Sequence, residues 1–463
     1  MPEDVYENAP STAEDLAFLL SDDLISDIVD AVRAQDADTV HASLEDLSNA
    51  DTAELIAKIG EEDRRELLSM YAGDINPVAF TEMDTELRRA ALSTMPPSEV
   101  VSIISALESD DALELIIDLD EDQQRSIMQK LSAKMRTAVE EGLSFPEDSA
   151  GRLMQREVVA IPQFWTVGKA IDYLRSAADD LPEDFFDVFV IDPAYHLTGQ
   201  IPLNKLVRAD RATKLQELTL DETHPIPATM DQEEVAHIFR RDDTASTPVI
   251  DDHGRLIGVI TIDDIVDVID QEAQEDLLRM AGVDQGDLYR AVWSTTGTRF
   301  RWLFVNLLTA ILASATISLF DATIQEMIAL AVLMPIVASM GGNAGTQALT
   351  VSVRALATRE LSDTNTWRVI GKECMVGSLN GIAFAFITGI ITLLWFQSPL
   401  LGLIIGLAMI INLFVAAFFG VSIPILITRM GGDPAISSTV FLTTITDVVG
   451  FFAFLGLAAL LLF

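Results

Sequence analysis

The carboxylate of Asp447 lies in the middle of the last 30 residues, 434–463, which are otherwise uncharged. A segment of this length and composition can cross a bilayer as a tilted helix. An ionised carboxylate at mid-membrane costs at least about 2.5 to 3.5 kcal/mol, so we expect it only where water, a cation or a partner solvates it. Asp447 therefore predicts a cation path. The alternative is a protonated Asp447 that packs helices by hydrogen bonding to Thr443, Thr444 or Thr446.

A run of small and polar residues, Gly-Gly-Asn-Ala-Gly-Thr-Gln at 341–347, lies inside another apolar segment, after a proline. Small residues allow backbones to approach closely, and carbonyl groups freed near the proline or the glycines can face water or an ion. Asn343 lies 11 residues from Arg354 and Asp447 lies 13 from Pro434, which places both about 16 to 20 Å from one membrane face. Asn343 and Asp447 can therefore line one site. Helix packing alone is the other interpretation of the run.

Five apolar segments are predicted to cross the membrane: 302–320, 328–357, 375–396, 400–427 and 434–463. An odd number of crossings puts the two chain ends on opposite sides. If the acidic part before these segments stays in the cytoplasm, all seven Lys and Arg residues from Arg299 onward fall at cytoplasmic helix ends, as the positive-inside rule requires. We therefore expect a multi-pass protein of the cell (inner or plasma) membrane, with a cytoplasmic N-terminus and an outer C-terminus.

The net charge of −41 lies entirely in the first 298 residues, because seven acidic and seven basic residues cancel from Arg299 onward. Such an acidic surface excludes nucleic acid as a partner and concentrates cations, including divalent ones. Arg outnumbers Lys and Asp is plentiful, as in proteins from cells with a high-salt cytoplasm. Metal sensing by the carboxylates is the other explanation, and both can hold. Cys374 is the only cysteine, so no intrachain disulfide is expected, and the N-terminus has no cleavable signal pattern.

Between residues 17 and 145, apolar residues recur at helical spacing, as in Ile25, Ile28, Val29 and Val32. The segments are short and broken by Asp, Ser or Pro caps. This pattern predicts helices only, stacked as pairs in a small superhelix.

A repeat with a period of 59 residues follows. Val-Ile-Asp at 190–192 precedes Gly199 in the same way as Val-Ile-Asp at 249–251 precedes Gly258. Each unit reads as strand, turn, strand and helix, which resembles a pair of CBS domains.

In the CBS pairs that bind adenine nucleotides, a Gly, a Thr or Ser three residues later and an Asp three beyond that hold ribose and phosphate. The second unit matches with Gly258, Thr261 and Asp264, whereas the first has Pro202 and Lys205 at the last two positions. The resemblance therefore implies at most one site per chain for ATP or another adenine nucleotide.

Residues 271–298 are predicted to form an acidic connecting helix, with breaks at Gly282 and Gly286. Carboxylates crowd its beginning and the end of the second repeat: Asp267, Asp270, Glu272, Glu275 and Asp276. Like charges at this density repel unless cations bridge them, so we expect the segment to move when the cations leave. A solvated acidic face is the alternative.

Three motifs, PIVASMGGNAGTQALT, GGDPA and TTITDVVGF, stand in this order after a helical domain and a CBS pair. Together they resemble the MgtE-type magnesium channels over nearly the whole chain. The resemblance implies a homodimer with a pore at its two-fold axis, which the cytosolic domains close when magnesium is abundant.

The expected fold is multidomain, with an all-α superhelical N-terminal domain, an α/β CBS-pair domain and a five-helix α transmembrane domain. The expected boundaries are a disordered acidic N-terminus at 1–16, the superhelix at 17–145, CBS units at 150–210 and 211–270, the connecting (plug) helix at 271–298 and the pore domain at 299–463.

The resemblance also implies roles for individual residues. Asp447 matches the pore carboxylate that recognises hydrated Mg²⁺, and Asn343 and Thr346 match polar residues beside the pore. Asp433 matches an acidic residue at the cytoplasmic mouth that shares bound metal with the sensor, and an ordinary helix cap before Pro434 is compatible with that role. Regulatory Mg²⁺ is implied at Glu233, Asp243, Asp264, Asp267, Glu272, Glu275 and Asp276.

Mg²⁺ sheds water reluctantly and is commonly held through its hydration shell by one or two carboxylates, so two copies of Asp447 across a two-fold axis suit it. The sequence has no phosphate-binding loop and no chain of membrane carboxylates. We therefore expect passive import along the membrane potential and no enzymatic activity. The alternatives are an ion-coupled Mg²⁺/Co²⁺ carrier or exporter with Asp447 as its exchange site, and a membrane-anchored CBS sensor of metal or nucleotide. An intramembrane aspartyl protease would need a second carboxylate, which one chain lacks at mid-membrane.

Overall fold

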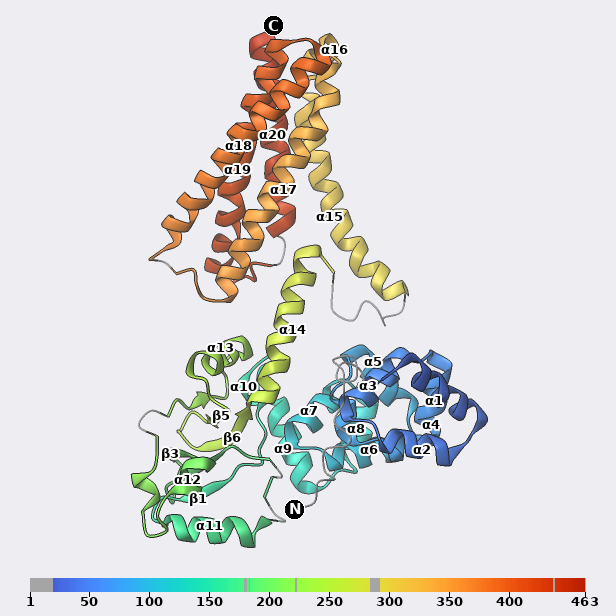
Figure 1. The fold of residues 1–463 in the computed structure, drawn as a ribbon, viewed down its shortest axis with the longest axis vertical. Helices are drawn as coiled ribbons and strands as arrows, with labels where there is room; N and C mark the ends of the chain where they lie inside the picture. Colours follow the sequence, from blue (N-terminus) through green and yellow to red (C-terminus); the bar gives the residue numbers. More distant parts are fainter. Residues whose placement is uncertain are drawn as a thin grey trace, which may run out of the picture. The chain divides into compact units, whose positions relative to one another are not determined.

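The computed structural model describes residues 20–178, 181–182, 184–220, 223–283, 292–362, 364–435 and 438–462 (Figure 1). The segment 1–16, predicted to be disordered, lies outside the described residues, as does Gly286. The chain divides into two compact units, Met1–Asp270 and Gln271–Phe463.

The first part of the N-terminal unit consists of short helices around one apolar core, which confirms the predicted all-α domain. Side chains at their N-terminal ends accept hydrogen bonds from backbone N–H groups, as Ser21, Asp36 and Ser48 do. The helices are α1 (Asp22–Ala34), α2 (Ala37–Glu45), α3 (Asn49–Lys58), α4 (Glu61–Tyr71), η1 (Ala72–Asp74), η2 (Pro77–Phe80), α5 (Thr85–Thr94), α6 (Pro97–Ala106), α7 (Ser109–Ile117), α8 (Glu121–Met128) and α9 (Ala133–Leu143).

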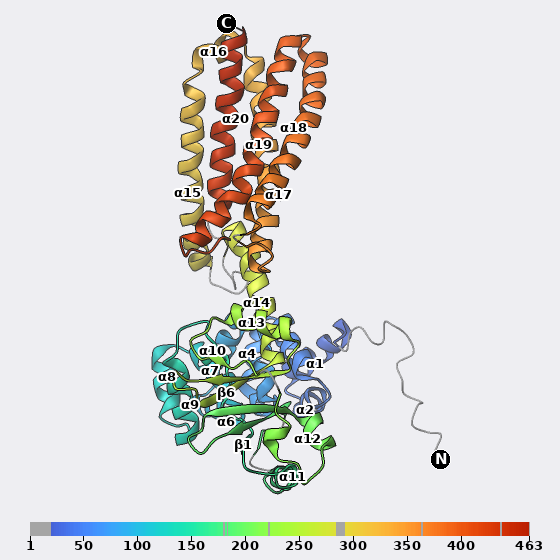
Figure 2. The ribbon, with the colours of Figure 1, turned by 90° about the vertical axis from the view of Figure 1, so that its left-hand side faces the viewer.

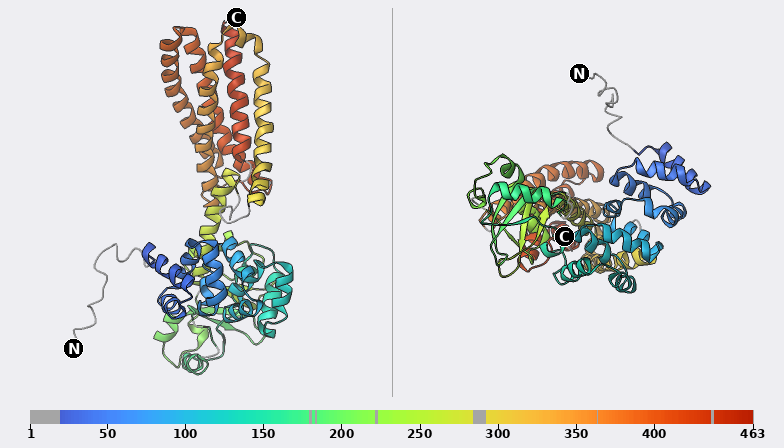
Figure 3. Two further views of the ribbon diagram at one scale, coloured as in Figure 1. Left: turned by 90° about the vertical axis from the view of Figure 1, so that its right-hand side faces the viewer. Right: turned by 90° about the horizontal axis from the view of Figure 1, so that it is seen from below.

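The second part of this unit holds two three-stranded sheets, in the orders β1-β2-β3 and β4-β5-β6. In each sheet the first pair of strands is parallel and the second antiparallel. The elements are α10 (Ala150–Leu153), β1 (Ala160–Pro162), α11 (Val167–Ser176), β2 (Asp187–Ile191), β3 (Leu197–Pro202), α12 (Leu203–Arg208), η4 (Leu215–Glu217), β4 (Ile226–Pro227), α13 (Gln232–Asp242), β5 (Ser246–Ile250) and β6 (Leu256–Thr261). Figure 3 shows this part beside the helical domain. Helix α10 contacts α7 and α9 of that domain.

Equivalent positions of the two repeats meet each other between the sheets. The hydroxyl of Ser246 donates to Asp187 Oδ2 at 2.6 Å, and these residues are 59 positions apart. His196 and Arg255, also 59 apart, form an antiparallel bridge. The repeat is thus a pair of like units related by a pseudo-two-fold axis, which confirms the CBS-pair prediction.

The helix after β6, α14 (Ile262–Ala281), contains most of the acidic segment. It ends where Gly282 adopts a φ of +70°, so the predicted break at this glycine is confirmed. Backbone bonds from Gly282 N to Arg279 O and from Val283 N to Leu278 O, both 3.0 Å, close the last turn. The helix therefore ends at Ala281, earlier than the end expected for the predicted helix over 271–298.

The C-terminal unit contains five helices that are long and apolar enough to cross a membrane (Figure 2). They are α15 (Val292–Ser318), α17 (Ala329–Ala357), α18 (Thr366–Phe396), α19 (Pro399–Arg429) and α20 (Ser438–Leu462), with the short α16 (Asp321–Glu326) between the first two. This confirms the predicted number of membrane helices among the described residues.

Three of these helices do not begin where the apolar pattern predicted. α15 and α18 begin ten and nine residues earlier, because polar residues extend a helix beyond its apolar stretch. α20 begins at Ser438 rather than at Pro434. Asp447 is therefore nine residues, about 14 Å, into its helix rather than the 13 residues counted above.

The helix α19 is the central one of the C-terminal unit. It packs against α17, α18 and α20, and more of its length is buried than that of the other four. Its contact with α18 is made by small residues: a Cβ on Gly402 would lie only 2.7 Å from the carbonyl oxygen of Gly389. The apolar core of this unit lies mainly between α17, α19 and α20.

Candidate cation sites

Asn343 and Asp447 lie at the same level of the membrane unit. Gly341 of α17 and Gly450 of α20 pack against the side chain of Asn412 in α19. Asn343 comes two residues after Gly341 and Asp447 three residues before Gly450. Because α17 and α20 run in opposite directions (Figure 1), both positions lie on the same side of Asn412, offset along the bundle by only about 1.5 Å.

The carboxylate of Asp447 is half-buried, and within the described residues it makes no hydrogen bond or ion pair. The hydroxyls of Thr443, Thr444 and Thr446 donate instead to carbonyl oxygens of α20 at 2.6 to 3.0 Å. The alternative that these threonines hold a protonated Asp447 therefore has no support in these contacts. The carboxylate is accessible to a cation or its hydration water.

The two other predicted pore residues differ in their surroundings. The side chain of Asn343 is exposed. The half-buried Thr346 donates its hydroxyl to the carbonyl of Gly342 at 2.9 Å, which leaves its oxygen able to accept from water.

The end of α14 and the loop before α20 form an acidic group that contains one arginine. The guanidinium of Arg279 pairs with the carboxylates of Glu275 and Asp433. Asp433 also accepts a hydrogen bond from Ala435 N at 2.7 Å, so it caps the following turn and carries the ion pair as well. The hydroxyl of Thr439 donates to Met280 O at 3.0 Å.

Asp276 belongs to the same acidic group. Burial, followed by the charges of Asp433 and Glu272, raises the pKa of Asp276 to about 6. The structure thus brings together four of the predicted regulatory residues, Glu272, Glu275, Asp276 and Asp433. The sequence analysis missed Arg279, although it is the basic residue of the last turn of α14.

A second acidic group forms in the N-terminal unit, where the start of α7 meets the start of α14. Burial and neighbouring carboxylates raise the pKa of Glu108 to about 7, of Asp111 to about 6 and of Asp264 to about 7. Burial and the charge of Asp264 hold the pKa of Asp110 well above its usual range. Burial likewise raises the pKa of Asp267.

The sequence analysis missed Glu108, Asp110 and Asp111, because their place before an apolar run indicated only a helix cap. Their approach to Asp264 depends on two helices more than 150 residues apart. Within the described ranges, no three His, Cys, Asp or Glu side chains are arranged to hold a metal ion directly.

We expect this acidic group to make the protein more stable as the pH falls from about 7.5 to 5.5 without divalent cations. Folded pKa values near 6 and 7 exceed the ordinary ones near 4, so the folded state binds more protons in this window and the free energy of unfolding decreases as pH rises. The midpoint of thermal unfolding of the intact protein in detergent should increase by several degrees. The double substitution Glu108→Gln and Asp264→Asn should flatten this dependence, and a midpoint that decreases on acidification would contradict it.

Two predicted regulatory residues are not brought together. Glu233 lies at the start of α13 and Asp243 just beyond its end, so they are separated by about 15 Å along the helix. Asp243 has a φ of +51° and terminates the helix.

The three residues of the predicted nucleotide motif have contacts within the chain. Thr261 donates its hydroxyl to Asp264 Oδ2 at 3.0 Å. A Cβ on Gly258 would lie 2.8 Å from Gln155 O, so this glycine is needed for the bridge between residue 155 and Val259. Packing alone therefore accounts for the glycine.

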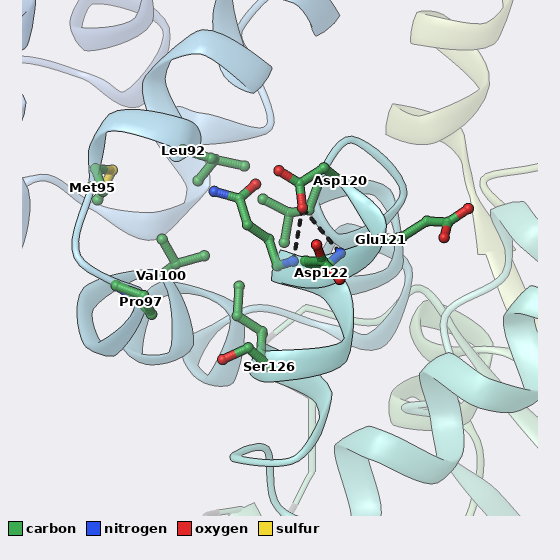
Figure 4. Close-up of a pocket in the computed structure, with 11 residues that line it drawn as sticks. Leu92, Met95, Pro97, Val100, Asp120, Glu121, Asp122 and Ser126 are labelled. Carbon is green, nitrogen blue, oxygen red and sulfur yellow. Dashed lines mark hydrogen bonds between the residues drawn. The ribbon is translucent and has the colours of Figure 1, made fainter.

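A cavity of about 430 Å³ opens in the helical domain between α5, α6 and α8 (Figure 4). Leu92, Met95, Pro97 and Val100 line one side of it. Asp120 on the other side accepts hydrogen bonds from the N–H groups of residues 122 and 123, which caps α8. The Asp120 carboxylate in the wall of this cavity therefore acts as the N-terminal cap of α8.

Family profiles match three parts of the chain. They are a divalent cation transporter profile (MgtE) at 334–457, the MgtE intracellular N domain at 47–148 and a CBS domain at 217–271. The three matches fall on the membrane helices, the short helices and the second repeat.

Curated relatives agree with these matches. The magnesium transporter MgtE of Thermus thermophilus is 35% identical over 76% of this chain and 78% of its own length. That of Bacillus subtilis is 28% identical over 94% and 97%. A crystal structure of the cytosolic domain of the Mg²⁺ channel MgtE in complex with ATP is 28% identical, covers 53% of this chain and 99% of its own, and has a TM-score of 0.49. The extent and identity of the Thermus thermophilus match show that the chain belongs to the MgtE family of magnesium transporters.

Proposed function

We propose that the protein is a Mg²⁺-selective channel that imports Mg²⁺ down its electrochemical gradient and is closed by cytosolic Mg²⁺. The observation that carries this proposal is the carboxylate of Asp447, unpartnered within the described residues and level with Asn343 in the membrane unit of a magnesium transporter. A buried charge without a partner is costly in a membrane, and a passing cation supplies the missing charge.

The residues of the membrane unit suit a hydrated ion. Mg²⁺ keeps several waters and is held by few carboxylates. In a homodimer, two Asp447 carboxylates across the two-fold axis would accept hydrogen bonds from those waters, and the amide of Asn343 and the hydroxyl of Thr346 would add polar contacts. Each 100 mV of membrane potential, negative inside, then drives a divalent ion inward by about 4.6 kcal/mol.

Closure would depend on the acidic groups at both ends of α14. Mg²⁺ between the carboxylates of Glu272, Glu275, Asp276 and Asp433 would stabilise the closed arrangement, and its loss would leave repulsion that favours the open one. Asp264 and Asp267 would act in the same way with Glu108, Asp110 and Asp111. Glu233 and Asp243, at opposite ends of α13, would have to bind at separate places.

We further propose that the protein is a homodimer in the cell membrane, with its N-terminus in the cytoplasm and its C-terminus outside. The distribution of Lys and Arg supports this orientation. Gly258, Thr261 and Asp264 support at most one adenine nucleotide site per chain.

The test is single-channel recording in excised patches or planar bilayers, with Mg²⁺ as the only permeant cation. Cytosolic Mg²⁺ is stepped from zero to roughly 10 mM, a range that spans the weaker affinities of acidic oxygen sites. Unitary currents that close as cytosolic Mg²⁺ rises support the proposal. Metal uptake into liposomes without unitary current would instead indicate an ion-coupled carrier, and a protein that moves no metal would favour the sensor.

We expect Arg279→Gln to make closure more sensitive to Mg²⁺. The arginine pairs with Glu275 and Asp433, so its loss leaves two carboxylates for the ion and removes a repelling charge. A charge of this kind about 5 Å from a divalent ion changes its affinity about 5- to 15-fold in a watery site. The Mg²⁺ concentration that halves the open probability should decrease by this factor.

The matched control is Arg65→Gln, which removes an exposed arginine whose one ion-pair partner among the described residues is Glu61, one turn away. It should leave closure unchanged. An Arg279→Gln channel that needs more Mg²⁺ to close would show that the arginine itself holds the closed state.

A further inference from the structure

One buried amide of α19 contacts two other membrane helices at the level of the proposed pore. The side chain of Asn412, in the middle of α19, has no exposed surface. Its Nδ2 donates to the carbonyl oxygen of Val337 in α17 at 2.8 Å. Its Oδ1 is buried and has no hydrogen-bond partner among the described residues.

Two glycines make room for this amide. A Cβ on Gly341 of α17 would lie 2.2 Å from Asn412 Nδ2, and a Cβ on Gly450 of α20 would lie 2.7 Å from the same atom. Cβ atoms do not approach nitrogen so closely, so neither position accepts a larger residue while Asn412 is present. The amide therefore fixes how closely α17 and α20 approach α19.

The fold of this unit does not require an amide at position 412. A buried carbonyl oxygen without a partner costs more free energy than one interhelical hydrogen bond in a membrane typically returns. Leucine has the same branched skeleton of four side-chain heavy atoms and leaves no polar atom unsatisfied. An apolar residue at position 412 would therefore not destabilise the fold. We infer that the amide has a role other than stabilising the fold.

We propose that Asn412 is a positioning residue for the ion path, which holds Asn343 of α17 level with Asp447 of α20. This inference rests on the proposed role of Asp447. Asn412 does not touch the ion. It acts through Gly341, two residues before Asn343, and through Gly450, three residues after Asp447. A hydrated ion is selected by the spacing of several weak ligands. If Asn343 and Asp447 lose their alignment, ion selectivity should therefore change before folding does.

The experiment compares Asn412→Leu, the control Ser422→Ala and Asp447→Asn in full-length protein in liposomes. Ser422 lies in the same helix and its hydroxyl is likewise buried without a partner among the described residues. The readouts are the initial rates of Mg²⁺ and Ca²⁺ uptake and the thermal midpoint in detergent. We expect Asn412→Leu to lower the ratio of Mg²⁺ to Ca²⁺ uptake at least tenfold, with an unchanged or higher midpoint and unchanged dimer.

Asn412→Asp keeps the shape and, when protonated, can still donate to Val337 O, so it should restore most of the ratio. Ser422→Ala should behave as the unmodified protein. An unchanged ratio in Asn412→Leu, while Asp447→Asn abolishes uptake, would overturn this inference and leave the proposed function standing. Full uptake by Asp447→Asn would overturn the proposed function itself.

A second pair of variants keeps the test valid if Asn412→Leu does not fold. Gly450→Ala should reduce the yield of folded protein because its new methyl group meets the amide. Gly450→Ala combined with Asn412→Ala should recover the yield but not the Mg²⁺ to Ca²⁺ ratio. Recovery of both would show that Asn412 only fills space.

Discussion

Substitution of Asp447 by Asn is expected to reduce Mg²⁺ flux at least 100-fold while the protein stays folded. Asn has the same shape but no charge, and the carboxylate has no partner within the described residues that would be left behind. A carboxylate about 5 Å from a divalent ion is worth several kcal/mol at an effective dielectric constant near 20, so its loss from both subunits would remove the attraction that draws the ion to mid-membrane. Single-channel recording and uptake into liposomes measure the effect.

The matched control for this substitution is Asp321→Asn. Asp321 begins the short helix α16 between two membrane helices, and it accepts a hydrogen bond from Gln325 at 2.7 Å. Its neutralisation should leave flux within about twofold, as expected of a screened surface charge. Flux that persists in Asp447→Asn but responds to proton gradients in the unmodified protein would favour a coupled carrier.

The second large effect is expected from neutralising the acidic end of α14. The triple substitution Glu272→Gln, Glu275→Gln and Asp276→Asn removes the three carboxylates gathered near Asp433. Without these carboxylates the closed arrangement binds Mg²⁺ only weakly, so the channel should stay open at about 10 mM cytosolic Mg²⁺. Open probability against cytosolic Mg²⁺ measures this directly.

Its control removes the same number of charges elsewhere. Asp22, Asp23 and Asp27 lie exposed within six residues of α1, and replacing all three by Asn should leave closure unchanged. If the α14 triple variant closed like the unmodified protein, the three carboxylates would not bind regulatory Mg²⁺. They would then form only a solvated acidic face, as expected of a surface adapted to high salt.

Local sequence patterns determined the elements and their approximate limits. Helical spacing with Ser and Asp caps gave the short helices, the 59-residue repeat gave two like α/β units, and apolar length gave five membrane helices. Asp447 could be singled out for the same reason, because the cost of a charge in a membrane depends only on its surroundings being apolar. These properties are set by residues close together in the chain.

The tertiary structure decided which charges and polar groups meet. Asp110 and Asp264 are 154 residues apart, as are Arg279 and Asp433, and only packing brings either pair together. Asn412 could have been noticed as a lone amide in an apolar helix, yet its contact with Gly341 and Gly450 depends on how three helices pack. The reason is physical: periodicity fixes the face that a helix buries, whereas its partner and register follow from the fit of side chains contributed by distant parts of the chain.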